Sequence, residues 1–376
     1  MKFDFHKEAF FDNHTHLLLM DKTNVSVRDF IGNYYHGGDA RMEAAYEHLP
    51  YQGVILSLVN SMAEYLGCEA DLETVVKVRN THTDNADALR QYIKDMYADE
   101  NIVGTTLDCE LPMGHPDTLC FPCDTRRLFQ YEKPLFRLLK SEPDYDSFLA
   151  AFLDTVRKAK AEGFAGLKSH IAERYSLKVY EVPAEDARKC YKRAQEGDKQ
   201  AEKDIYFAAF SELLLLAGEL KLPVHFHTGS SGFGKFKEVY PMDPLLIVDF
   251  LSNRKYADTT IVFLHGSYPF VRHSAMMCFN FPNVYMDFSQ TLPWEGMGLV
   301  SMLEDALSLA PHDKIMLGSG QHFYSETAWL AARTAKAALA KALEDITDQK
   351  LLNEQQALRS ARMILSENAI RIMGRS

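Results

Sequence analysis

Eight short apolar runs alternate with long stretches of helical periodicity in this chain, and this alternation constrains the fold more than any other feature. Several of the runs are continuously apolar, as parallel strands buried on both faces should be. Eight such strands alternating with helices predict an α/β fold, a (β/α)₈ TIM barrel. The expected strands are 10–14, 102–107, 127–131, 165–170, 223–227, 260–265, 284–288 and 314–317.

The whole chain, 1–376, is expected to be one barrel domain with two helical insertions. The segment at about 21–99 is too long for an ordinary loop after a strand, and its periodicity is helical. A second, charged insertion at 177–197 is interpreted as a helical hairpin or a lid. The hydrophobic composition of 47% allows a large core, and no repeat, low-complexity tract or flexible linker divides the chain.

Histidines stand at the ends of three expected strands. Because side chains at i and i+2 lie on the same side of a strand, His14 and His16 are expected to aim at one point. His227 and His265 end the fifth and sixth strands, at the barrel end where active sites lie. Clustered neutral imidazoles commonly hold catalytic divalent metals, so a metal site is predicted here.

Each of these histidines also has a structural alternative. A histidine at the end of an apolar strand is often a core residue satisfied by hydrogen bonds, and this applies to His227 and His265 taken singly. His225 lies deeper in the expected barrel, where the core interpretation is favoured over the ligand interpretation. Asp12 is expected to support the first pair of histidines rather than to bind metal.

These strand-end residues, taken as a set, resemble the amidohydrolase superfamily. The set consists of Asp12-x-His14-x-His16 on the first strand, Lys168 ending the fourth, and His227 and His265. The chain is similar to the amidohydrolase-related branch (amidohydrolase 2), which includes aminocarboxymuconate-semialdehyde-decarboxylase-like proteins. It is closer still to the hydrolase-like domain of glutamine-synthetase-fusion proteins. The stretches that carry the resemblance are 166–172 with Arg174, 226–229, 264–270 with Arg272, 283–289 and 367–369.

The resemblance implies a metal-dependent hydrolase that uses a metal-activated water on a small amide, ester or lactone. It implies a divalent metal, zinc above all, as one or two ions. The implied metal ligands are His14, His16, Lys168, His227 and His265. The implied catalytic residues are His265, Lys168 and His322, and the implied substrate-binding residues are His170, Arg174, Tyr268, Arg272 and Gln290. Side chains of these substrate-binding types are also common as structural salt-bridge partners.

Lys168 carries the largest open question. In binuclear members of the superfamily the corresponding lysine is carboxylated, and the carbamate bridges two metal ions. The alternative is an ordinary amine that pairs with a carboxylate or a substrate acid, since an isolated charge at the end of a buried strand is costly. The sequence leaves a carboxylated lysine and an ordinary amine equally open.

One position departs from the family pattern. Gly320 stands where the superfamily carries a metal-binding, proton-transferring aspartate after the eighth strand. Either Gln321, His322 or Asp287 takes over its work, or catalysis is impaired. Two alternatives to the hydrolase therefore stay open: a metal-dependent non-oxidative decarboxylase of a small acid, and a binding barrel without turnover.

Charge and composition limit the classes of molecule that the protein is expected to bind. The net charge of −11 argues against a nucleic-acid surface or a polybasic membrane contact, so a small-molecule substrate is expected. The amino-terminal residues lack a signal peptide's apolar region, and six scattered cysteines suit reduced thiols, so a cytoplasmic location is expected. Cys120 and Cys123 are interpreted as loop thiols, and 229–234 as a mobile active-site loop. Barrels of this kind are often homo-oligomers, but the sequence does not fix a number.

Overall fold

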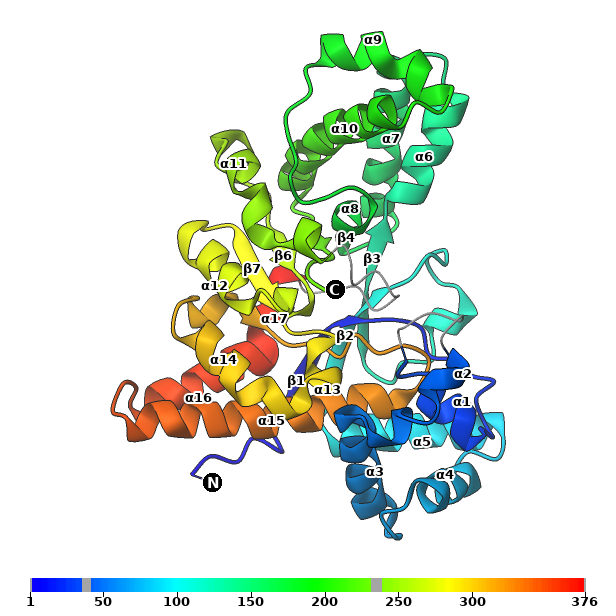
Figure 1. The fold of residues 1–376 in the computed structure, drawn as a ribbon, viewed down its shortest axis with the longest axis vertical. Helices are drawn as coiled ribbons and strands as arrows, with labels where there is room; N and C mark the ends of the chain where they lie inside the picture. Colours follow the sequence, from blue (N-terminus) through cyan, green and yellow to red (C-terminus); the bar gives the residue numbers. More distant parts are fainter. Residues whose placement is uncertain (1, 36–41, 231–238, 375–376) are drawn as a thin grey trace.

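Eight parallel strands form one sheet in the order β1 to β8, and the sheet curves into a nearly closed barrel (Figure 1). This computed structural model describes residues 2–35, 42–230 and 239–374. The predicted (β/α)₈ barrel is confirmed. The strands are β1 (Phe10–Thr15), β2 (Ile102–Asp108), β3 (Asp124–Gln130), β4 (Gly166–Ser169), β5 (Val224–Phe226), β6 (Ile261–Phe263), β7 (Val284–Asp287) and β8 (Ile315–Met316).

The barrel closes where the segment after β8 meets β1. The Asn13 N–H donates to the Leu317 carbonyl at 2.9 Å. Further along, the Gly320 N–H donates to the His14 carbonyl at 2.7 Å, and the His16 N–H donates to the Gln321 carbonyl at 2.9 Å. These bonds fix the segment that carries Gly320 directly against the histidine pair of β1.

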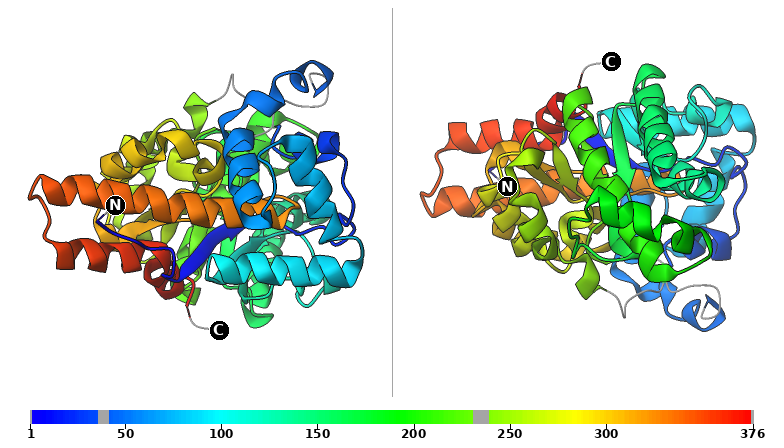
Figure 2. Two further views of the ribbon diagram at one scale, coloured as in Figure 1. Left: turned by 90° about the horizontal axis from the view of Figure 1, so that it is seen from below. Right: turned by 90° about the horizontal axis from the view of Figure 1, so that it is seen from above.

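Helices follow the strands and surround the barrel (Figures 1 and 2). None of the helices in the described part of the chain is long and apolar enough to cross a membrane. Between β3 and β8 they are α6 (Glu132–Ser141), α7 (Tyr145–Ala161), α8 (Ile171–Arg174), α9 (Ala184–Gln195), α10 (Lys199–Leu220), α11 (Val248–Leu251), α12 (Val271–Asn280), α13 (Thr291–Trp294) and α14 (Leu299–Leu307). After β8 come α15 (Ser325–Asp348), α16 (Glu354–Arg362), the π-helix η11 (Met363–Glu367) and α17 (Asn368–Ile372). Single turns of 3₁₀ helix are η2 (Leu49–Tyr51), η3 (Pro116–Thr118), η5 (Tyr240–Met242), η6 (Pro244–Ile247), η7 (Arg254–Tyr256), η8 (His265–Ser267), η9 (Gly296–Gly298) and η10 (His312–Lys314).

The segment 21–99 folds as helices packed beside the barrel, in the blue region of Figure 1. A buried ion pair joins it to the barrel: Arg79 Nε lies 2.7 Å from Glu326 Oε1 at the start of α15. The same guanidinium donates to the carbonyls of Lys22 and Thr23. The helices are α1 (Val27–Gly32), α2 (Met42–Ala45), α3 (Gly53–Leu66), α4 (Leu72–Thr81) and α5 (Ala86–Asp99).

The segment 177–197 contains α9, which lies against α10 at the outer edge of the molecule (Figure 1). The two helices together form an antiparallel pair, so the helical-hairpin interpretation involves α10 as its second arm. Asp198 caps α10 by accepting from the N–H groups of Gln200 and Ala201, which explains why a new helix starts immediately after Gly197.

A small apolar cluster fills the barrel below the strand ends. It contains Phe11, Val262, Leu264 and Met316, with Ala369 of α17 packed against it. The Phe11 ring requires a glycine opposite it, because a Cβ on Gly104 would lie 2.4 Å from the ring. Since His14 follows Phe11 by three residues on β1 and His265 directly follows Leu264, this apolar cluster adjoins the residues at the strand ends.

Candidate metal centre and active site

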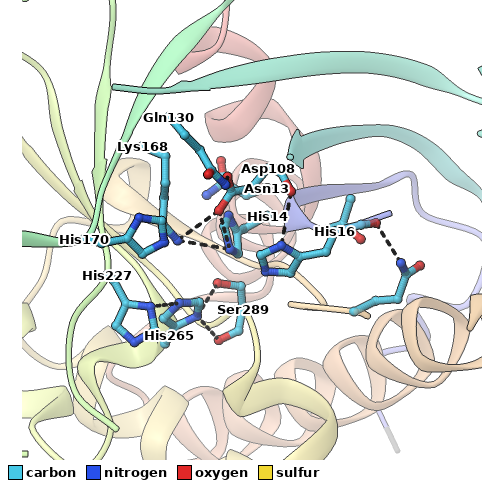
Figure 3. A network of polar contacts seen from close by, with 12 residues as sticks. Asn13, His14, His16, Asp108, Gln130, Lys168, His170, His227, His265 and Ser289 are labelled. Carbon is cyan, nitrogen blue, oxygen red and sulfur yellow. Dashed lines mark hydrogen bonds and ion pairs between the residues drawn. The ribbon is translucent and has the colours of Figure 1, made fainter. Parts of the chain in front are cut away.

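His14, His16 and Asp108 converge at the carboxyl ends of β1 and β2 (Figure 3). Each offers one ligand atom, and these atoms all lie within 4.8 Å of one another. The His16 Nδ1 lies 3.1 Å from the Asp108 carbonyl oxygen, which can only accept, so Nδ1 carries the proton and Nε2 keeps its lone pair. The hydrogen bond from Nδ1 fixes the orientation of the ring, as a hydrogen bond from the other ring nitrogen commonly does in metal-binding histidines.

Asp108 is held between two side chains. Gln130 Nε2 donates to Oδ1 at 2.6 Å. Oδ2 faces the Lys168 ammonium at 3.2 Å and accepts no hydrogen bond from the described residues. Burial opposes ionisation of this carboxyl, but the Lys168 charge, with His16 and His170, holds its pKa below the usual range. Asp108 is therefore a carboxylate with one oxygen still able to bind a metal.

His227 and His265 form a hydrogen-bonded pair beside the first two histidines. His265 Nδ1 lies 3.2 Å from the Ser289 carbonyl, so it carries the proton, and His265 Nε2 accepts from His227 Nδ1 at 3.2 Å. His227 Nε2 is left with a lone pair, buried and without a partner among the described residues. Glu173 Oε2 lies 3.8 Å from His227 Nδ1. The His265 ring centre is 5.2 Å from that of His14, which places the pair next to the candidate metal ligands.

Burial keeps these imidazoles neutral. It lowers the pKa of His16 to about 4. It also lowers the pKa values of His14, His227 and His265 well below their ordinary value, with the Lys168 charge adding to the effect. Neutral imidazoles are the form that binds a metal ion, so the site is poised for a ligand role at neutral pH.

His225 lies one residue pair deeper, where its Cα is the register partner of Lys168. Both of its ring nitrogens are buried without a hydrogen bond among the described residues. Burial, followed by the Lys168 charge, lowers its pKa to about 3. His225 belongs to the barrel interior and is not part of the His14–His16–Asp108 group.

The segment after β8 has no room for a side chain at Gly320. Its φ is +58°, and a Cβ there would lie 2.5 Å from the Gln290 backbone nitrogen. The adjacent Ser319 is held by Asp12, whose Oδ1 accepts from the Ser319 N–H at 2.7 Å. Burial raises the pKa of Asp12 to about 7. Asp12 therefore fastens β1 to the segment after β8.

Asp287 is also fully engaged. It accepts from Asn13 Nδ2, the His265 N–H, and both the N–H and hydroxyl of Ser289, at 2.7 to 3.1 Å. A carboxylate with four donors positions its neighbours, and here it fixes the turn at His265. It does not face the group of His14, His16 and Asp108 with a free oxygen.

A cavity of about 760 Å³ opens beside this group. His16 and Asp108 form one wall, and His170 and Arg174 line another part of it. His322 also lines the cavity, and its ring stacks on that of His16 with 3.9 Å between the ring centres. The remaining lining residues are Leu17, Cys109, Glu110, Leu111, Gln130, Glu132, Lys133 and Phe323.

Three of the expected substrate-binding residues lie elsewhere. Arg272 pairs with Asp305 at 2.8 Å on the outside of α12. Tyr268 is half-buried next to the β6 turn, where its carbonyl accepts from the Ser230 N–H. Gln290 stands in a left-handed conformation against Gly320. Of the expected active-site loop 229–234, residues 231–234 lie outside the described residues.

Two residues of the site were missed by the sequence interpretation, Asp108 and Glu132. Each follows an expected strand within a residue or two, as the predicted ligands do. A systematic search for acidic residues directly after each strand would have found both. Nothing local, however, marks which such residue points inward, because that depends on strand register.

A family model described as Amidohydrolase matches residues 137–375. Protein fluG of Emericella nidulans is 31% identical over 119 residues, which make up 31% of this chain and 14% of that protein. The match thus spans a small part of fluG.

Solved structures share the fold at low identity. A protein from Lactobacillus casei ATCC 334, described as a metal-dependent hydrolase, has a TM-score of 0.83 at 18% identity, covering 98% of this chain and 97% of that one. An uronate isomerase from Bacillus halodurans C-125 has a TM-score of 0.68 at 12% identity, covering 99% and 94%. A glucuronate isomerase from Caulobacter crescentus has 0.69 at 12%, covering 98% and 91%.

Proposed function

The chain belongs to the amidohydrolase family, and on that premise we propose that it is a hydrolase that uses a metal-activated water on a small amide, ester or lactone. The observation that carries this proposal is the convergence of His14, His16 and Asp108 within 4.8 Å at the barrel mouth. Active sites of this fold lie at that end, and a cavity large enough for a small molecule adjoins the group.

The donor set fits a divalent metal. Two neutral imidazoles and one carboxylate are a ligand set found at catalytic zinc sites with an open position. Asp108 Oδ2 accepts no hydrogen bond from the described residues, as expected of an oxygen that can bind a metal cation. Zinc in such a set lowers the pKa of its bound water to about 7 and polarises a carbonyl group.

Lys168 acts in this proposal as an ordinary amine. Its ammonium lies 3.2 Å from Asp108 Oδ2 and 3.5 Å from His14 Nε2, so it neutralises the carboxylate before a metal binds. This supports one ion, held by His14, His16 and Asp108, over a carbamate-bridged pair of ions. His227, whose Nε2 has no partner among the described residues, is the best-placed additional ligand, whereas His265 Nε2 accepts a hydrogen bond from His227.

His322 is proposed as the proton acceptor. It stands two residues after Gly320, its ring lies against His16, and it lines the cavity. A neutral imidazole there takes the proton of the attacking water and returns it to the leaving nitrogen or oxygen when the C–N or C–O bond breaks. The carboxylates of Asp12 and Asp287 are each committed to several donors, so neither supports that role as well.

The test combines metal content with turnover. We expect about one zinc per chain by elemental analysis, in line with a single site of this ligand set. Hydrolysis of a panel of small amides, esters and lactones should disappear on chelation and return with zinc. Turnover that survives complete metal removal contradicts the proposal. Release of CO₂ from small unsaturated or aromatic acids, without hydrolysis of any panel member, would favour a decarboxylase instead.

A further inference from the structure

Glu132 is a buried carboxylate on the wall of the cavity. It is the first residue of α6, and it is 8% exposed. Its Oε1 accepts from the His170 N–H at 2.6 Å and from the Tyr206 hydroxyl at 3.1 Å. One oxygen therefore joins the start of α6 to the residue after β4 and to α10, and this explains why a carboxylate or an amide is needed at the position.

The second oxygen of Glu132 has no such role. Oε2 is buried and accepts no hydrogen bond from the described residues. Among the described residues, its ion-pairing partner is His170, whose Nδ1 lies 3.9 Å away, beyond hydrogen-bond distance. A buried charged acceptor without a partner is destabilising, and native structures rarely leave one without a reason.

The cations near the cavity are engaged elsewhere. Lys168 pairs with Asp108, and Lys133 pairs with Glu110. The Arg174 guanidinium lies over the Phe136 ring, 4.0 Å from its centre. In the part of the chain that the structure describes, no side-chain nitrogen of a lysine or arginine lies within 4.0 Å of the Glu132 carboxylate oxygens. Among the described residues, therefore, none supplies a positive partner to this oxygen, and a cationic ligand in the cavity would supply one.

The carboxylate is also held rigidly. Tyr206 donates to Glu132, and its oxygen lies 3.0 Å from the Tyr131 hydroxyl, which in turn lies 2.6 Å from Ser169 Oγ. All of these side chains are buried, so Glu132 cannot turn toward bulk water without breaking this network. A preorganised carboxylate on the cavity wall, with one oxygen that has no hydrogen-bond partner among the described residues, is a binding group for a cationic donor.

We propose that Glu132 binds a protonated amino group of the substrate, so that the preferred substrates are amides or esters of amino-bearing acids. This inference rests on the proposed hydrolase function. Glu132 then sets substrate choice: an ammonium donates a charge-assisted hydrogen bond to Oε2, and an uncharged acyl chain offers that oxygen no donor.

The experiment compares two matched series of p-nitroanilides on the zinc-loaded protein. One carries the acyl groups glycyl, β-alanyl and 4-aminobutyryl, and the other carries acetyl, propionyl and butyryl. For wild type we expect kcat/KM to be higher by about tenfold or more for at least one amino member over its counterpart. In Glu132→Gln this preference should vanish, so that the ratio of kcat/KM between the two series falls to about one.

The substitution is conservative, because a glutamine oxygen can still accept from His170 and Tyr206, and thermal unfolding checks that the variant folds. Glu202→Gln is the matched control: Glu202 is a part-buried carboxylate that also accepts from a tyrosine hydroxyl, that of Tyr175, but it does not line the cavity. It should keep the wild-type preference.

Equal kcat/KM for both series in wild type overturns the inference alone, whether or not Glu132→Gln folds, and so does a preference that persists in Glu132→Gln. A wild-type protein that hydrolyses ordinary esters and lactones but neither anilide series also overturns it. If wild type hydrolyses nothing at all with metal bound, the proposed function fails and the inference with it.

Discussion

The Asp108 carboxylate and the Lys168 ammonium form a fully buried ion pair, 3.2 Å from Oδ2 to Nζ, at the mouth of the barrel. The two side chains come from β2 and β4, and they meet across the barrel interior beside His14. The Lys168 charge balances that of Asp108, so the metal-free site can bury a carboxylate that is able to bind a metal ion. The roles of Asp108 and Lys168 can be tested separately by substituting one residue at a time.

Asp108→Asn should weaken zinc binding by at least 10- to 100-fold, because a carboxylate ligand is replaced by a neutral amide. Isothermal titration of the metal-free protein with zinc measures this directly. Asp146→Asn, which removes an exposed partner of Arg188, is the control and should bind zinc as wild type does. Unchanged affinity in Asp108→Asn would rule out Asp108 as a ligand.

Lys168→Met should destabilise the metal-free protein by about 3–5 kcal/mol, because Asp108 is left as a buried charge without its partner. Zinc should restore much of this stability, since the bound cation compensates the carboxylate. Urea unfolding with and without zinc gives both values. If Lys168 were instead a carboxylated bridging ligand, the variant would lose metal, and zinc would restore little.

Gly320→Asp should destabilise the protein and should not create an active site. The residue has a φ of +58°, and its Cβ would lie 2.5 Å from the Gln290 nitrogen, so the backbone has to move. Strain of this kind costs on the order of 1–3 kcal/mol or more. Thermal unfolding and the hydrolysis panel provide the readouts. A stable variant with raised turnover would show that a decayed aspartate site can be rebuilt here.

The stability of the metal-free protein should fall as the pH is lowered from about 6.5 toward 3, partly through His225. Its pKa is about 3 in the folded state, against an ordinary 6.5. In this window the unfolded chain binds a proton that the folded chain does not, so the free energy of unfolding decreases with falling pH, by up to a few kcal/mol. Asp12 acts in the opposite sense, because burial raises its pKa to about 7 and its contribution is lost as pH rises toward that value.

His225→Leu separates the two contributions. Neither ring nitrogen of His225 has a partner in the described residues, so an apolar side chain of similar size should be tolerated near neutral pH. The variant's stability should fall less steeply than that of wild type between pH 6.5 and 4, as urea titrations at several pH values would show. Its zinc affinity should match that of wild type. Loss of zinc binding would mean that His225 is a ligand after all.

Arg79→Met should cost about 3–5 kcal/mol, because Glu326 is left as a buried carboxylate without its ion-pair partner. Denaturant unfolding measures this loss. The double variant Arg79→Met with Glu326→Gln should recover part of it, since no unpaired charge stays buried. Arg28→Met, which breaks an exposed pair with Glu43, should leave stability close to that of wild type, because solvent screens such pairs.

The sequence determined the barrel and two of the three residues of the candidate metal site. Strand and helix periods follow from backbone geometry, so alternating apolar runs predicted all eight strands within a few residues. The i and i+2 spacing of His14 and His16 placed both imidazoles on one face for the same local reason. Adjacency within one strand needs no knowledge of what lies opposite.

Tertiary structure decided the rest. Asp108 reaches the histidines only through the pairing of β2 with β1, and Arg272 turns outward because Asp305 of α14 lies beside it. The hydrogen bonds that hold Glu132 and the close contact of Gly320 with Gln290 likewise depend on segments far apart in the chain. Strand register and helix packing set such contacts, and these depend on the whole core rather than on any local pattern.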